Sequence, residues 1–228
     1  MQAVILAAGL GVRLKPLTDH TPKAMIDLCG KPLLEYTLRS LPNTIDEIFI
    51  VVNYLRDQIE ERFGTVWHNK PIHYTVQDPL TGTGGALHLL KNKLNGRFLV
   101  VNGDDLYAQA DLEALIQHDL AILVSTTSDR IRAGAILKPD GTFARLGELD
   151  EPTNYRICGA YVLDQRFFDY PLVEIQVGSH KEFGLPQTLA KMTVNHPISI
   201  EKATFWFPVG TYAELEKAQH ELSTPNCG

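Results

Sequence analysis

Residues 3–14 read AVILAAGLGVRL. A short, continuous apolar run that ends at a glycine predicts a buried β-strand followed by a tight turn. Gly9 and Gly11 allow backbone N–H groups to approach phosphate oxygens, and Arg13 adds a cation that a polyphosphate needs. The glycines alone are equally compatible with an ordinary turn, because this segment contains neither GxGxxG nor GxxxxGK[ST].

Outward from this segment, apolar runs alternate with helical patterns. We expect buried strands at residues 3–8, 47–53, 72–76, 97–102 and 120–126, and helices at residues 32–41, 55–63, 84–93 and 111–118. Such alternation is typical of a largely parallel sheet with right-handed crossovers.

The second half of the chain is less regular. We expect strands at residues 133–137 and 159–163, joined by the turn Pro139-Asp140-Gly141, and helices at residues 185–192 and 212–222. Because no internal repeat or linker is visible, we expect one domain over residues 1–228. The predicted fold is α/β, a Rossmann-like three-layer α/β/α sandwich with a mixed, mainly parallel sheet.

The composition disfavours several classes of protein. The chain has 228 residues and a formal net charge of -6, with no dense Lys/Arg run, so we expect no nucleic-acid partner. No apolar run approaches the roughly 18 residues of a membrane span, and no basic leader is visible, so we expect no membrane contact and a cytoplasmic location. Cys29, Cys158 and Cys227 are widely spaced, which favours reduced thiols over a disulfide framework or a zinc site.

Ligands of an open parallel sheet bind outside the carboxyl ends of its strands. Four stretches of this sequence lie at such ends: residues 8–23, residues 77–85, residues 102–105, and Gly134 together with Gly159. Their agreement predicts a ligand site at this edge of the sheet.

Residues 6–18, LAAGLGVRLKPLT, and residues 21–25, TPKAM, match the pattern L-A-x-G-x-G-x-R with a downstream P-K. With GKPLLEY at residues 30–36, the chain resembles the nucleotide-sugar pyrophosphorylases (sugar-1-phosphate nucleotidyltransferases), in a short form without a C-terminal β-helix. The resemblance implies that the nucleotide is bound by Leu6, Ala7, Ala8, Gly9 and Gly11. It also implies catalytic roles for Arg13 on the triphosphate and for Lys23 on the phosphates.

Gln77 and the pair Gly82-Thr83 carry the expected base site. An amide offers both a donor and an acceptor for a base edge, and the resemblance places uracil or thymine at a glutamine followed five residues later by Gly-Thr. UTP is therefore the favoured donor, with dTTP next. By itself the stretch is also compatible with a glycine-rich loop that caps a helix.

Asn102, Gly103, Asp104 and Asp105 follow a predicted buried strand. A carboxylate in this place suits a Mg²⁺ ion shared with phosphates, although a polar turn would have the same composition. The resemblance implies that Asn102 and Gly103 bind the nucleotide and that Asp104 is the magnesium ligand. Asp105 is interpreted as a neighbour with no direct role.

Gly134, Glu148 and Gly159 fall where the resemblance places sugar-binding residues. Each could equally be a strand-end or turn residue. Two departures weaken the match: Cys158 replaces a common Asn or Thr, and Leu149-Asp150 stands where a lysine often follows the glutamate. A third departure is Pro208 in the segment WFPVGT, at the place of an aspartate that often binds a second magnesium ion.

The implied reaction transfers a nucleotidyl group from a nucleoside triphosphate to a sugar 1-phosphate and releases pyrophosphate, with Mg²⁺ as cofactor. The expected partners are these two small molecules, and a homo-oligomer is compatible with the sequence. Two alternatives remain open. One is a catalytically impaired regulatory homologue that binds nucleotide-sugars, motivated by Pro208, and the other is CTP-dependent transfer to a non-sugar phosphate such as phosphocholine.

Overall fold

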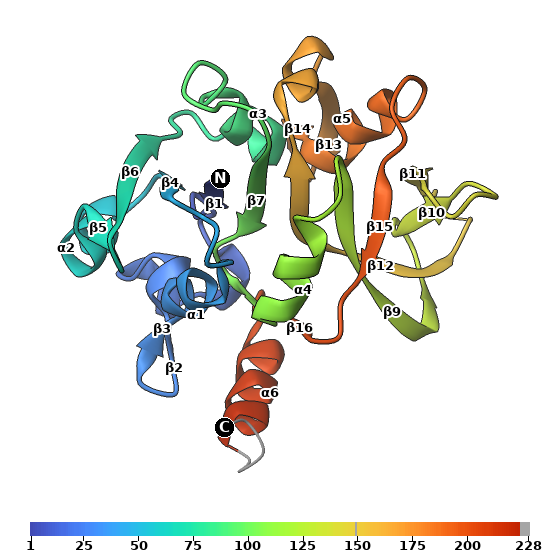
Figure 1. The fold of residues 1–228 in the computed structure, drawn as a ribbon. Coiled ribbons are helices and arrows are strands. Elements are labelled where there is room, and N and C mark those ends of the chain that lie inside the picture. Colours follow the sequence, from blue (N-terminus) through green and yellow to red (C-terminus); the bar gives the residue numbers. More distant parts are fainter. Residues whose placement is uncertain (149, 224–228) are drawn as a thin grey trace.

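The computed structural model describes residues 1–148 and 150–223 (Figure 1). An eight-stranded sheet runs in the order β15-β9-β12-β7-β1-β4-β6-β5. Its strands are β1 (Gln2–Leu6), β4 (Glu47–Val52), β5 (Val66–Trp67), β6 (Lys70–Val76), β7 (Phe98–Asn102), β9 (Ala121–Ile131), β12 (Thr153–Leu163) and β15 (Ser199–Lys202).

The sheet is mixed but mainly parallel, as predicted. Strand β1 pairs in parallel with both β7 and β4, and β4 pairs in parallel with β6. Strand β12 is antiparallel to both of its neighbours, β7 and β9, so β9 again runs in the direction of β7. The carboxyl ends of β1, β6, β7 and β9 therefore lie on the same edge of the sheet.

Helices cover both faces because alternate residues of the central strands point to opposite sides. Ala3 and Ile5 of β1 pack in one core with helices α1 (Leu33–Ser40), α2 (Arg56–Phe63) and α4 (Gln109–Leu115). Val4 and Leu6 pack in a second core with helices α3 (Gly82–His88) and α5 (Leu185–Met192). This arrangement confirms the predicted three-layer sandwich.

Smaller elements complete the structure. The short pairs are β2 (Asp27–Leu28) with β3 (Lys31–Pro32), β8 (Asp105–Tyr107) with β16 (Trp206–Pro208), β10 (Ala135–Leu137) with β11 (Phe143–Leu146), and β13 (Val173–Val177) with β14 (His180–Gly184). Helix α6 (Tyr212–Ser223) projects below the sheet in Figure 1, and its Leu215 and Ala218 join a third apolar cluster with Leu28. One-turn 3₁₀ helices occur at Val12–Leu14, Leu17–Asp19 and Lys23–Met25, and a longer one at Gln165–Asp169.

The predicted connection in the second half is wrong. The turn at Pro139-Asp140-Gly141 joins β10 to β11, and the strand expected at residues 159–163 begins already at Thr153. The early residues of β12 are mostly polar and alternate between buried and exposed, so they do not form the continuous apolar run from which a buried strand is predicted. Among residues 1–148 and 150–223, no helix is long and apolar enough to cross a membrane.

We expect Asp111→Ala to lower the free energy of unfolding by about 2–4 kcal/mol, measured by urea denaturation. Asp111 is 4% exposed, and its carboxylate accepts hydrogen bonds from the backbone N–H of Thr204 at 2.8 Å and of Phe205 at 3.0 Å. The substitution leaves both donors without their acceptor. Glu113→Ala on the exposed side of the same helix is the control, and an equal loss in both variants would contradict the assignment.

Candidate active site

A cavity of about 440 Å³ lies at the carboxyl ends of β1, β6 and β7. Three of the four predicted stretches contribute to it. The predicted residues that line it are Leu6, Ala7, Ala8, Gly9, Gly11, Lys23, Gln77, Gly82, Thr83, Asn102 and Asp104. The parallel order of the strands thus brings the glycine loop, the glutamine and the aspartate together around one cavity.

The glycine loop after β1 folds tightly at Gly11. This residue has a φ of +63°, and a Cβ atom there would lie 2.8 Å from Thr18 Cγ2 and 3.0 Å from Lys23 Cβ. The Thr18 hydroxyl donates a hydrogen bond to the Gly11 carbonyl at 2.9 Å. A side chain at position 11 would therefore push the segment that carries Lys23 away from the loop.

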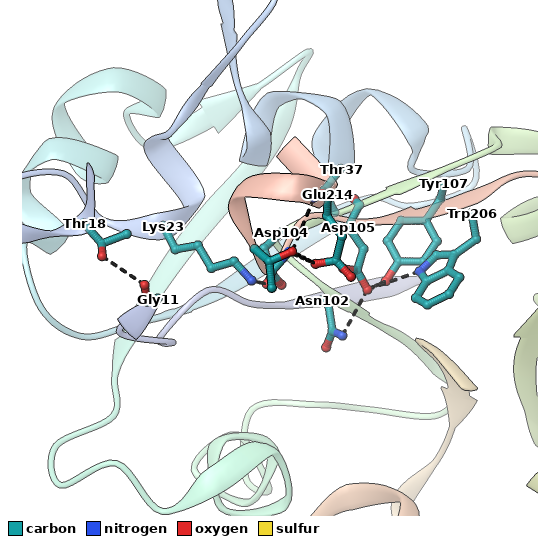
Figure 2. Close-up of polar contacts among 12 residues, drawn as sticks. Gly11, Thr18, Lys23, Thr37, Asn102, Asp104, Asp105, Tyr107, Trp206 and Glu214 are labelled. Atoms are coloured by element: carbon teal, nitrogen blue, oxygen red, sulfur yellow. Dashed lines mark hydrogen bonds and ion pairs between the residues drawn. The ribbon is translucent and has the colours of Figure 1, made fainter. Parts of the chain in front are cut away.

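Lys23 and Asp104 form an ion pair inside the cavity, and Figure 2 shows the two side chains pointing toward one another. The Lys23 side chain is 13% exposed and the Asp104 side chain 26% exposed. In the free protein the two charges neutralise each other. A phosphate that enters the cavity can take over the ammonium group, which frees the carboxylate to hold a cation.

Asp105 lies beside this pair but is buried. Its Oδ2 accepts hydrogen bonds from Asn102 Nδ2 at 3.3 Å and from Trp206 Nε1 at 3.2 Å. Burial, with the nearby charge of Asp104, raises the pKa of Asp105 to about 7. Asp105 therefore links the cavity residue Asn102 to β16, where Pro208 is its register partner.

The donor set fits a magnesium ion that is shared with substrate phosphates. Among residues 1–148 and 150–223, no group of three or more His, Cys, Asp or Glu side chains is arranged to hold a metal ion. Mg²⁺ does not need such a cage, because it is usually bound through one or two carboxylates, water and phosphate oxygens. Asp104 is the carboxylate that lines the cavity next to Lys23, so it is the residue that would hold the ion.

Gln77 is only 3% exposed and is fixed by its own loop. Its Nε2 donates hydrogen bonds to Thr81 Oγ1 at 3.0 Å and to the Gly82 carbonyl at 2.9 Å. Because the amide nitrogen is used in this way, the carbonyl oxygen Oε1 is left as the group for a ligand. The assignment of nitrogen and oxygen follows from this hydrogen-bond network.

The glycines of the loop GTGG are required by packing. Gly82 has a φ of +82°, and a Cβ atom there would lie 2.8 Å from the Phe183 carbonyl oxygen on β14. A Cβ atom on Gly84 would lie 3.0 Å from the same oxygen. The glycines thus let α3, which begins at Gly82, approach β14 closely.

The remaining predicted residues do not line the cavity. Gly103 packs behind it, with its N–H donating to the Leu6 carbonyl at 2.9 Å. Gly159 lies in β12 with a φ of +67°, and its α-carbon faces the Asn102 side chain. Arg13 is exposed, and its guanidinium lies next to Gly210.

The other two predicted sugar-binding residues are Gly134 and Glu148. Gly134 packs against the backbone of Tyr155 and the side chain of Thr153, and Glu148 is exposed after β11. Both lie outside the cavity lining. The departures noted at Leu149 and the thiol of Cys227 lie outside the described residues.

The sequence prediction missed one wall of the cavity. Val177, His180 and Glu182 line it, and all three belong to the β13–β14 hairpin. The sequence does contain a hairpin signal. Two short runs in which apolar and polar residues alternate flank Gly178-Ser179, a pair of residues typical of a hairpin loop. The polar residues of the second run hid its strand character.

Comparison with known proteins agrees with this geometry. The model of the family described as "Nucleotidyl transferase" matches residues 2–224. The bifunctional protein GlmU of Methanocaldococcus jannaschii is 33% identical over 226 residues, covering 97% of this chain and 54% of the relative. GlmU of Methanococcus maripaludis strain C7 is 32% identical over 217 residues, covering 92% of this chain and 51% of the relative. The chain thus spans about half the length of these relatives.

Other matches run along the whole chain. A D-glycero-alpha-D-manno-heptose 1-phosphate guanylyltransferase from Aneurinibacillus thermoaerophilus is 26% identical, with coverage of 97% of this chain and 98% of the relative. The solved structure of the inositol-1-phosphate CTP transferase from T. maritima has a TM-score of 0.79 at 19% identity, over 98% of this chain and 96% of that chain. This structural similarity supports the α/β fold described above. On the family match and the GlmU relatives, the chain belongs to the nucleotidyl transferase family.

Proposed function

We propose that this protein transfers a nucleotidyl group from a nucleoside triphosphate to a sugar 1-phosphate, giving an NDP-sugar and pyrophosphate. The observation that carries the proposal is the single cavity that joins the glycine loop, the Lys23–Asp104 pair and the Gln77 loop. A cation and a carboxylate beside a backbone anion site suit a triphosphate, and a buried amide at the other side suits a base.

The chemistry needs positioning and charge neutralisation more than a protein acid or base. An oxygen of the acceptor phosphate forms a bond to the α-phosphorus of the triphosphate. The bond from the α-phosphorus to the bridging oxygen breaks, and pyrophosphate leaves with that electron pair. Lys23 holds the phosphates between which the new bond forms. Arg13, which lies outside the cavity lining beside Gly210, is proposed to reach the triphosphate from the end of the glycine loop.

Asp104 is the proposed ligand of Mg²⁺, which when bound neutralises charge on the phosphate oxygens and on the departing pyrophosphate. Pro208 stands at the place of the aspartate that often binds a second magnesium ion in the family. The register partner of Pro208 is the buried Asp105. Asp104, water and the phosphates therefore make up the proposed coordination.

UTP is the proposed donor, with dTTP next. The free Oε1 of Gln77 can accept a hydrogen bond from the N3–H that uracil and thymine share. Cytosine has no hydrogen at N3, so the same oxygen would face an acceptor there, which disfavours CTP. The relatives named above include a guanylyltransferase and a CTP transferase, so the donor is best settled by a direct comparison of all four.

The second candidate is a regulatory homologue that binds nucleotide-sugars without turning them over. Pro208 favours it, because proline offers no side-chain oxygen to a metal ion. The ion pair of Lys23 with Asp104 in the cavity favours the enzyme.

The first experiment is an assay of pyrophosphate release with Mg²⁺, across UTP, dTTP, GTP and CTP and a panel of sugar 1-phosphates with phosphocholine included. We expect release with UTP and one or more sugar phosphates. If no combination releases pyrophosphate, and nucleotide-sugars still raise the melting temperature of the protein, the result would contradict the enzymatic function and favour the regulatory homologue.

We expect Lys23→Ala and Asp104→Ala each to lower kcat by at least about 100-fold, because each removes a charge that faces the reacting phosphates. Lys15→Ala is the matched control, since Lys15 is 60% exposed and paired with Asp19 on the surface. Near-normal turnover in both cavity variants would contradict the proposed reaction.

A further inference from the structure

The β13–β14 hairpin adds a histidine and a carboxylate to the cavity. Its register pairs Val177 with His180 and Ile175 with Glu182, so these four side chains share one face. His180 Nε2 lies 2.9 Å from Glu182 Oε1. The Glu182 side chain is 28% exposed and that of His180 is 61% exposed, so both remain accessible from the cavity that they line.

The hairpin is fixed to the loop that carries the expected base site. The N–H of Phe183 donates to the Thr81 carbonyl at 2.8 Å, and the N–H of Leu185 donates to Thr83 Oγ1 at 3.2 Å. A Cβ atom on Gly82 would lie 2.8 Å from Glu182 Cβ, so the carboxylate side chain starts directly beside this loop. Its position relative to Gln77 and Thr83 is therefore set by the fold.

The chemistry of this wall selects the kind of group that it can bind. A carboxylate without a lysine or arginine partner repels phosphates, so the wall does not suit the triphosphate. One oxygen of Glu182 is engaged by His180, and the other can accept a hydrogen bond from a hydroxyl group. Because Nε2–H of His180 donates to Glu182, Nδ1 of the neutral imidazole can accept from a second hydroxyl, so the pair suits adjacent ring hydroxyls.

A quaternary ammonium group is a poor fit to the same wall. Such cations are recognised by the faces of Phe, Tyr or Trp side chains. Of the residues that the structure describes, none of these three types lines the cavity. Val177 and Leu80 instead offer aliphatic surface, which can pack on the C–H groups of a sugar ring.

We propose that His180 and Glu182 bind adjacent ring hydroxyls of a substrate. The proposal rests on the function proposed above. The hydroxyls could belong to the acceptor ring or to the ribose of the nucleotide, and the experiment separates these two sources.

The test measures binding by calorimetry, so it does not depend on turnover. The probes are UDP-glucose, UDP-N-acetylglucosamine, dTDP-glucose, GDP-mannose and CDP-choline, each beside its parent diphosphate. Glu182→Gln and His180→Asn are compared with the wild-type chain. The control is Glu174→Gln, on the opposite face of the same hairpin, where Glu174 pairs with Lys181 at 2.6 Å.

We expect the wild-type chain to bind at least one nucleotide-sugar more tightly than its parent diphosphate. Glu182→Gln should lower the affinity for that nucleotide-sugar at least about tenfold and leave the affinity for the parent diphosphate unchanged. This result would assign the hydroxyls to the acceptor ring. Equal weakening of both probes assigns them to the ribose.

Several results would overturn the inference. These are unchanged affinities in the Glu182 and His180 variants, an equal effect of Glu174→Gln, tighter binding of CDP-choline than of any nucleotide-sugar, or no binding of any probe. A wild-type chain that shows the expected binding pattern but releases no pyrophosphate would instead refute the proposed catalysis and leave the hydroxyl site standing.

Discussion

Parallel pairing of β7, β1, β4 and β6 is the constraint on which the rest of the site depends. It places Leu6 and Asn102 in register at the same edge of the sheet. The pairing continues into the loops, since the N–H of Ala7 donates to the Val51 carbonyl at 2.8 Å and the N–H of Gly103 donates to the Leu6 carbonyl at 2.9 Å. The loop after β1 and Asp104 therefore meet because the backbone hydrogen bonds of three strands are continued beyond their ends.

The charged side chains at this edge of the sheet differ in their burial. Lys23 and Asp104 face the cavity and compensate each other, while Asp105 is turned inward and is compensated by hydrogen bonds from neutral donors. Because burial raises the pKa of Asp105 to about 7, this inner carboxyl group carries only part of a full negative charge near neutral pH. In the proposed reaction a triphosphate would meet one exchangeable ion pair, with the proposed hydroxyl-binding residues His180 and Glu182 on β14.

The sequence predicted the parts that local patterns determine. Apolar runs located the central strands, and glycines with a downstream Pro-Lys located Lys23 in the site. The hairpin of Glu182 has a recognisable turn at Gly178-Ser179, but its place at the cavity could not be predicted, because the short and largely polar strand β14 reaches the cavity only through tertiary packing on α3. Arg13, Gly134 and Glu148 lie outside the cavity lining, because a motif fixes neither where a side chain points nor where a distant segment packs.

The proposed function depends on where a triphosphate binds. The most direct measurement is a crystal structure of this chain with UTP and Mg²⁺. We predict that the phosphates lie against residues 8–11 and Lys23, that the ion contacts Asp104, and that the base accepts or donates hydrogen bonds at Gln77 and Gly82. Triphosphate bound at another surface, or a base turned away from Gln77, would contradict the central claim.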